Sequence, residues 1–146
     1  MFRRHQREVY AYFLRMGTDA GAAEELTQET FVRACTAALR FRGDASVRTW
    51  LFGIAHRVLL EASRAGLFER VPPLEAVDRG ESIDLDARID VRRALASLGA
   101  TDREALVMVD VLGFEPIEVS RSLSITPEAF RVRLHRARAR LREAYG

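Results

Sequence analysis

The residues of this chain whose type and spacing could do chemistry are the arginines near its C-terminal end. Six of the twelve residues from Arg131 to Arg142 are arginine. A guanidinium group can donate two parallel hydrogen bonds to the edge of a guanine base, and it also binds phosphate oxygens. That chemistry favours a helix in the major groove of DNA, where phosphates line both walls. The alternative interpretation is a charged helix face in water.

A helix that carries these arginines is predicted over residues 126–145. Thr126 supplies an N-cap hydroxyl, Pro127 needs no N–H at this position, and Glu128 lies near the positive end of the helix dipole. At about 100° per residue, one narrow apolar stripe forms and the arginines fall on its two flanks. The stripe consists of Phe130, Leu134, Ala137 and Leu141.

A shorter helix is predicted just before this one. It carries Pro116 in its first turn, with Ile117 and Leu123 directed inward, and only a few residues separate it from Thr126. Two short helices joined by so tight a turn, with the second one basic, are typical of a helix-turn-helix. We expect base contacts from Arg131, Val132, His135 and Arg136, and backbone or packing roles for Arg133, Arg138 and Arg140.

Composition and motifs argue against other kinds of site. The histidines and the single cysteine show no metal-ligand spacing, and no Gly-rich phosphate loop or nucleophile motif is present. We therefore expect no catalytic residue, no metal and no cofactor. The net charge is only +2 over 146 residues, so local charge, rather than the total, points to a partner. The absence of a signal-peptide pattern and of a membrane span favours a cytoplasmic protein.

Helical spacing of apolar residues extends along most of the chain and predicts an all-α fold. Between residues 67 and 84, Pro72 and Pro73 are adjacent and no period is sustained, which indicates a flexible linker. The chain then divides into two small helical domains, 1–66 and 85–146, and the second contains the helix-turn-helix. The expected helices span residues 2–16, 20–40, 47–65, 84–98, 101–112, 115–123 and 126–145.

Two stretches of the first domain resemble the promoter-melting domain of bacterial extracytoplasmic-function (ECF) sigma factors: AEELTQETFVRA (Ala23–Ala34) and RFRGDASVRTWLFGIAHRVLL (Arg40–Leu60). The C-terminal RVRLHRARARLRE resembles the same family's domain for the minus-thirty-five promoter element. The two matches occur in family order and cover nearly the entire chain. The resemblance implies a protein that binds core RNA polymerase and promoter DNA, both as duplex and as melted single strand, and that an anti-sigma protein controls.

The resemblance also implies where each partner binds. A protein that opens DNA without doing chemistry must bind the separated strand better than the duplex, which requires flat side chains for flipped bases and cations for phosphates. For core polymerase we expect a docking surface of Leu26, Gln28, Glu29 and Arg33, with Glu29 and Arg33 paired along the helix. For the minus-ten element and melting we expect Phe41, Arg42, Gly43, Asp44, Ala45, Ser46, Arg48, Phe52, His56 and Arg57.

Other residues are expected to serve the core or to depart from the family pattern. Phe31, Cys35 and Trp50 are assigned to the core, whereas Thr49 is expected to point away from the buried stripe of its helix. Arg57 stands where the family commonly has Asn, which implies a different minus-ten preference. Ser124 replaces the usual turn glycine, at a cost of about 1 kcal/mol if its backbone is left-handed. Leu98 is followed by Gly99 instead of the usual proline.

Two further hypotheses remain open at this point. One is a helix-turn-helix regulator that binds its operator without polymerase and uses residues 1–66 to sense or to dimerise. The other is a helical interaction module that a partner covers and holds inactive, which is compatible with the first interpretation.

Overall fold

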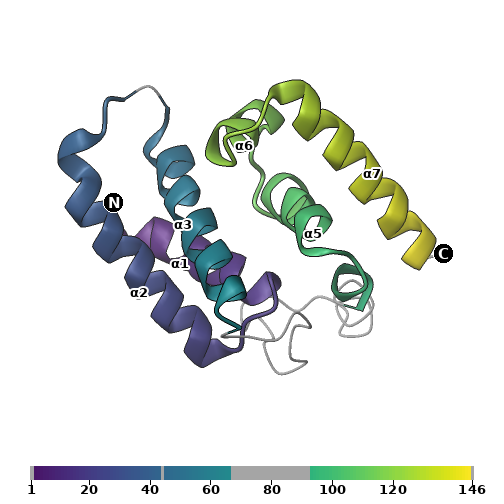
Figure 1. Cartoon of the computed structure of the whole chain (residues 1–146), viewed down its shortest axis with the longest axis horizontal. Helices are drawn as coiled ribbons and strands as arrows, with labels where there is room; N and C mark the ends of the chain where they lie inside the picture. The colour runs from purple at the N-terminus through teal and green to yellow at the C-terminus, as the bar shows by residue number, and fades with distance from the viewer. Residues whose placement is uncertain (1, 44, 67–92, 146) are drawn as a thin grey trace.

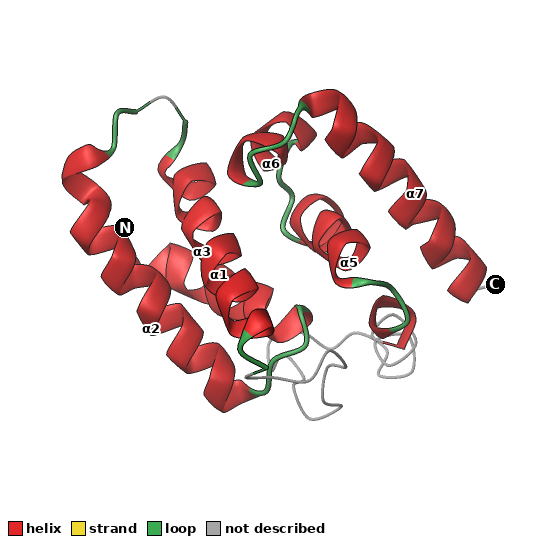
Figure 2. Ribbon diagram, viewed as in Figure 1, coloured by secondary structure: helices red, strands yellow, loops and turns green. Residues whose placement is uncertain are grey.

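A computed structural model of the chain describes residues 2–43, 45–66 and 93–145 (Figure 1). Every regular element within these ranges is a helix, which confirms the all-α prediction (Figure 2). The predicted linker, most of the helix predicted over 84–98, and Asp44 lie outside the described residues. No helix in the described ranges is long and apolar enough to cross a membrane.

The N-terminal half is a bundle of three helices. α1 (Phe2–Arg15) packs against α2 (Ala20–Ala37) and α3 (Val47–Arg64), and α2 lies beside α3 (Figure 1). α2 continues as a short 3-10 helix, Ala38–Arg40, before the loop that leads to α3. Helices α2 and α3 both begin at a polar N-cap side chain that accepts a hydrogen bond from a backbone N–H, as expected for residues that start helices.

The C-terminal half contains the predicted helix-turn-helix. α5 (Ala100–Leu106) continues as a π-helical turn, Val107–Val111, and packs against the long helix α7 (Pro127–Tyr145). Between them, α6 (Pro116–Ser122) begins at a proline, as predicted. α6 contacts α7 on one side and α3 of the first half on the other.

One hydrophobic core runs through both halves of the molecule. The ring of Phe52 on α3 lies 5.5 Å from the ring of Tyr12 on α1 and 4.9 Å from the ring of Phe114, which precedes α6. All three rings are buried. Burial of one such ring contributes about 2–3 kcal/mol, so this contact holds the helix-turn-helix against the first domain.

The buried stripe predicted on α3 is confirmed, but Thr49 departs from the prediction. Leu51, Ala55, Val58 and Ala62 are all buried. Thr49 is buried as well, because α6 covers the side of α3 that was expected to face solvent. Its hydroxyl donates a hydrogen bond of 3.0 Å to the Glu118 carboxylate on α6.

Two residues that were assigned to the interior are exposed instead. Cys35 is exposed, because the face of α2 on which it lies points away from α1 and α3. Ile117 is 52% exposed, because the inward face of α6 carries Val119 instead, whereas Leu123, directly after the helix, is buried as predicted. Phe31 and Trp50 are partly buried and pack against the core.

Candidate nucleic-acid interface

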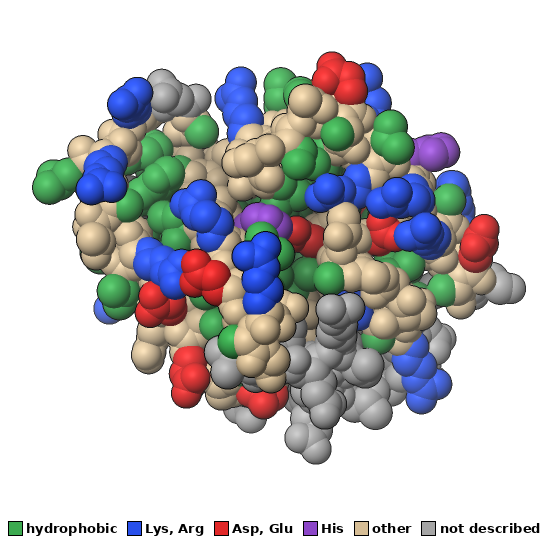
Figure 3. Space-filling model, in the orientation of Figure 1, with side chains coloured by type: hydrophobic (Ala, Val, Ile, Leu, Met, Phe, Trp, Pro, Cys, Tyr) green, Lys and Arg blue, Asp and Glu red, His purple; other side chains and the backbone are tan. Residues whose placement is uncertain are grey.

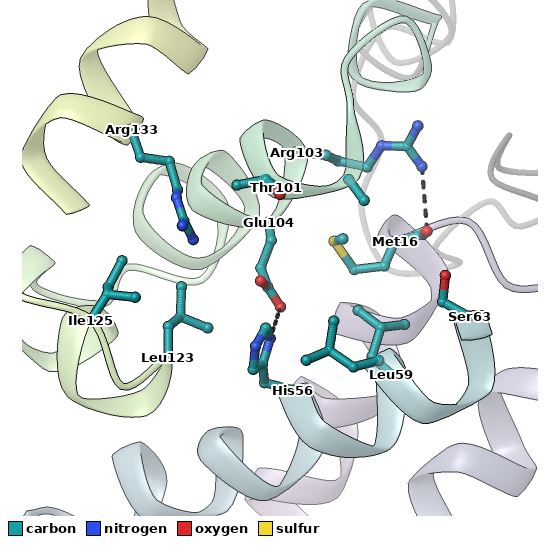
Figure 4. A pocket seen from close by; sticks show the side chains of 12 residues that line it. Met16, His56, Leu59, Ser63, Thr101, Arg103, Glu104, Leu123, Ile125 and Arg133 are labelled. Carbon is teal, nitrogen blue, oxygen red and sulfur yellow. Dashed lines mark hydrogen bonds and ion pairs between the residues drawn. The ribbon is translucent and has the colours of Figure 1, made fainter. Parts of the chain in front are cut away.

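Helix α7 presents its arginines because its opposite stripe is anchored. The Thr126 hydroxyl accepts a 3.1 Å hydrogen bond from the backbone N–H of Ala129, which confirms the predicted N-cap. Phe130, Leu134 and Ala137 are buried, as predicted. Packing of this stripe leaves His135, Val132, which is 66% exposed, and the arginines other than Arg133 on the outer side of the helix. Figure 3 shows blue side chains gathered along α7 with red carboxylates among them. Arg133 is partly buried and points into the cavity between the domains, toward Glu104 (Figure 4).

Carboxylates of the second domain hold three of these arginines. Arg136 Nη2 lies 3.3 Å from the Asp102 carboxylate, which Arg140 also contacts, and Arg138 Nη2 lies 2.7 Å from Asp110. Asp102 is buried whereas the guanidinium groups remain about half exposed. The hydrogen bonds that Arg138 donates to Asp110 raise the pKa of Arg138 and keep it cationic. These arginines therefore present donors from fixed positions, which reduces the entropy lost when they bind phosphate.

The turn between α6 and α7 ends in a left-handed residue. Ser124 has a φ of 57°, as expected if it takes the place of a glycine. The backbone N–H of Ser124 bonds to the carbonyl of Arg121, and that of Ile125 bonds to the carbonyl of Ser120. This pair of bonds forms the Schellman motif that normally ends in glycine.

Replacing Ser124 with glycine should raise the free energy of unfolding by about 0.5–1 kcal/mol, because glycine adopts positive φ without a steric cost. Denaturant unfolding followed by circular dichroism would measure the difference. Ser63→Gly, inside α3, is the matched control and should lower the free energy of unfolding by a similar amount. A loss of stability in Ser124→Gly would contradict the strain argument.

The loop before α3 brings part of the predicted minus-ten set together. The rings of Phe41 and Trp50 lie 5.1 Å apart, and Gly43 has a φ of 77°. The Ser46 hydroxyl caps α3. A cavity of about 280 Å³ beside this loop is lined by Phe41, Arg42, Ala45 and Arg57, among others.

Three members of the predicted set, Arg48, Phe52 and His56, face the second domain instead, and His56 contacts Glu104 there. The Arg48 Nε donates a 2.8 Å hydrogen bond to Glu8, and the guanidinium lies 3.8 Å from the ring centre of Phe114 and donates to the carbonyl of Leu112. Phe52 is fully buried against Phe114. In this arrangement neither Arg48 nor Phe52 is open to a DNA strand.

A buried polar cluster between the two domains was not predicted from the sequence. His56 Nδ1 lies 2.7 Å from Glu104 Oε2, and the Tyr12 hydroxyl donates a hydrogen bond to the same oxygen. Figure 4 shows the contact of His56 with Glu104 across the gap between α3 and α5. Nearby, buried Arg103 donates to the carbonyls of Leu95 (2.9 Å) and Met16 (3.3 Å), the second of which belongs to the first domain. The sequence offers one sign of this cluster, a glutamate, Glu104, that precedes an apolar run. Its partners Tyr12 and His56 could not be inferred, because they lie too far away along the chain.

The cluster predicts that the domains come apart at alkaline pH. Burial raises the pKa of Tyr12 well above its usual value, and the charge of Glu104 and its hydrogen bond raise it further. Because the folded pKa exceeds the unfolded one, this stability is complete below about pH 10 and falls by up to about 1.4 kcal/mol per pH unit above it. Unfolding measured from pH 8 to 11 should show this loss. Tyr12→Phe should flatten the slope above pH 10, and an unchanged slope would contradict the assignment.

The predicted polymerase-docking surface lies on the outer side of α2. Gln28 and Glu29 are exposed and Leu26 is partly buried. Arg33 Nε lies 2.8 Å from Glu29, which confirms the predicted helical pair, and Arg33 Nη1 also lies 3.1 Å from Glu61 on α3. Hydrogen bonding from Arg33 lowers the pKa of Glu61. Because these groups are exposed, the network adds little stability; it orients a charged surface that a partner can contact.

Comparisons with known proteins match both halves of the chain. Residues 1–66 match the family described as Sigma-70 region 2, and residues 88–141 match Sigma-70, region 4. The ECF RNA polymerase sigma factor SigM of Mycobacterium tuberculosis is 31% identical over 150 residues, a match that spans all of this chain and 76% of SigM. The RNA polymerase sigma factor CarQ of Myxococcus xanthus is 29% identical over 154 residues, with 100% of this chain and 87% of CarQ covered.

Solved structures share the fold. The sigma factor RpoE of Bartonella quintana, determined in complex with the anti-sigma factor NepR, superposes with a TM-score of 0.78 at 24% identity over 96% of this chain and 91% of that one. CnrH, determined in complex with the cytosolic domain of CnrY, gives a TM-score of 0.72 at 24% identity over 97% of this chain and 82% of that one. At this identity the structural likeness supports the fold.

Proposed function

Because the chain belongs to the family of ECF RNA polymerase sigma factors, we propose that it binds core RNA polymerase, directs it to promoters with minus-thirty-five and minus-ten elements, and promotes DNA opening. It acts as a transcription initiation factor rather than as a catalyst, and its place of action is the cytoplasm. The observation that carries the proposal is the pairing of two sigma-70 regions in family order with an arginine face on α7 whose opposite stripe is buried.

The positions of the individual residues support the roles proposed for them. On α7, Arg131 and Val132 are exposed at the N-terminal end of the helix, as base contacts require. The loop before α3 offers Phe41 and Arg42 to the melted strand. The exposed side of α2, with Gln28 and Glu29, is the surface for core polymerase.

The packed arrangement differs from the one that a promoter requires. The two elements are about 25 base pairs apart, which is roughly 85 Å of duplex. Helix α7, with 19 residues, is roughly 28 Å long and belongs to a domain packed directly on α3. The domains must therefore separate before both elements are bound.

Closure also supports control by an anti-sigma protein. RpoE, which has a similar fold, was determined in complex with an anti-sigma factor. A partner that binds both domains in the packed arrangement would keep Arg48 and Phe52 covered and so prevent promoter opening.

Run-off transcription with purified core polymerase over a library of promoters tests the proposed function. We expect transcripts that depend on this protein and that start downstream of two spaced elements. Failure to bind core polymerase would rule the proposal out. Tight binding to an operator in the absence of polymerase would support the helix-turn-helix regulator instead.

The two kinds of arginine on α7 should respond differently to substitution. Arg131→Ala should weaken the preference at one position of the minus-thirty-five element by about 1–3 kcal/mol, because a base contact carries sequence information. Arg138→Ala should weaken binding to all sequences alike. It should also reduce the slope of log K against the logarithm of the salt concentration by about 1, because one phosphate contact is lost. Binding to a set of singly substituted duplexes at two salt concentrations measures both effects. Equal behaviour of the two variants would defeat the assignment.

A further inference from the structure

We propose that the cavity between the loop before α3 and the turn of the helix-turn-helix binds a free nucleoside di- or triphosphate. Residues of both domains line this cavity. A nucleotide bound there would hold the domains in their packed arrangement.

The first argument is charge. Every ionisable side chain that lines the cavity is an arginine: Arg40, Arg42 and Arg57 from the first domain and Arg121 from the second. In the described part of the chain, no ion pair joins any of them to a carboxylate. Arg57 is near enough to Glu61 to lower its pKa, but less than Arg33 does. Four guanidinium groups around one cavity favour an anion with several charges, such as a chain of phosphates.

The second argument is shape and aromatic surface. Phe41 and Trp50 are partly buried, and their rings, 5.1 Å apart, both line the cavity. Nucleobases stack on aromatic side chains and on guanidinium planes, largely without regard to sequence. A cavity of about 280 Å³ lies just below the usual size of ligand sites, about 300–1,000 Å³, so it suits one nucleoside and not a run of bases.

The third argument is the wall that the second domain supplies. The Ser122 hydroxyl donates a 2.7 Å hydrogen bond to the carbonyl of Thr49. At Gly53 a Cβ atom would lie 3.4 Å from the Ser122 carbonyl oxygen, so the absence of a side chain there allows the two backbones to approach closely. These contacts bring Arg121 and Ser124 to the edge of the cavity.

This wall distinguishes a free nucleotide from a promoter strand. Arg121 and Ser124 line the cavity only while the domains are packed, whereas a protein bound to both promoter elements has them separated. A ligand that uses Arg121 therefore binds the packed form and stabilises it by mass action. Nucleotide binding itself does not depend on the proposed function; the consequence, competition between nucleotide and promoter, rests on it.

The single tryptophan of the chain allows a direct test, because Trp50 is the only source of indole fluorescence. The intact protein is titrated with ATP and with GTP at constant ionic strength, and in parallel with adenosine and with tripolyphosphate. We expect a saturable change in fluorescence with the nucleotides. Adenosine and tripolyphosphate should each bind about tenfold more weakly or worse, because each offers half of the recognised chemistry.

Substitutions decide whether the second domain takes part. Arg121→Ala should weaken nucleotide binding by about fivefold or more, whereas Arg142→Ala, an exposed arginine on α7 outside the cavity, should change it less than about twofold. Arg40→Ala should weaken binding as Arg121→Ala does, and it keeps the test valid if Arg121→Ala alters domain packing.

A short single-stranded DNA oligonucleotide is the third arm of the experiment. Saturation by the oligonucleotide alone, with no effect of Arg121→Ala, would overturn the proposal and leave the cavity to the melted promoter strand. Absence of saturation by any nucleotide would overturn it as well. Neither result requires polymerase, so both are distinguishable from a failure of the transcription assay.

Discussion

Replacing Phe52 with alanine should lower the free energy of unfolding by about 3–5 kcal/mol. Phe52 is fully buried and contacts Tyr12 of its own domain and Phe114 of the other. Its removal leaves a cavity in the core that the domains share. This loss is a large fraction of the total free energy of unfolding of a small domain. The variant should therefore be mostly unfolded near physiological temperature. Chemical denaturation measured by circular dichroism gives the difference directly.

Phe41→Ala is the matched control, because Phe41 is a partly buried phenylalanine beside the loop. It should cost about 1 kcal/mol or less in stability while it reduces open-complex formation, since it was assigned to the melted strand. A Phe52→Ala protein that is stable yet unable to open DNA would show that Phe52 receives a base and that the domains are separate in solution.

The second large effect is expected at Glu104. Glu104→Ala should lower the free energy of unfolding by about 2–4 kcal/mol, because the Tyr12 hydroxyl and the His56 ring lose their shared partner in a buried site. Glu104→Gln keeps the shape and an acceptor oxygen, so its loss should be clearly smaller. Glu118→Gln is a second control at the same domain boundary, where the carboxylate is only partly buried.

Domain separation provides an independent measurement for Glu104. Small-angle X-ray scattering of Glu104→Ala at a temperature where the helices persist should show a larger radius of gyration than for the wild-type protein. An unchanged radius with an unchanged stability would mean that the cluster does not hold the domains together.

The helices and their caps could be predicted because they depend on neighbours in the chain. Thr126 caps α7, Pro116 starts α6 and Ser124 adopts a left-handed backbone, each for a reason that a few adjacent residues determine. Apolar stripes were equally visible, since Phe130 and Leu134 follow the period of a helix.

What depends on the other domain could not be predicted. Thr49 was expected to point away from the core because it lies outside the apolar stripe of α3. The stripe predicts only one buried side of this helix, and α6 buries a second side that includes Thr49. Phe52 was assigned to DNA for a related reason: an aromatic residue beside a basic loop suits both a base and a packing partner. The choice depends on Phe114, more than 60 positions along the chain. The error for Cys35 was the opposite one: it was assigned to the core but is exposed, since no described helix covers its face of α2.

The continuous core has a consequence for how this protein evolves. A substitution that reshapes Phe114 or α6 alters the surface on which the first domain rests, so compensation must come from α1 or α3. The two halves should consequently diverge in step. In a chimaera that joins one half to the other half of a distant homologue, the two surfaces of the domain interface would not fit each other. Hydrophobic side chains would then be exposed and the protein would tend to aggregate, even where each half folds correctly by itself.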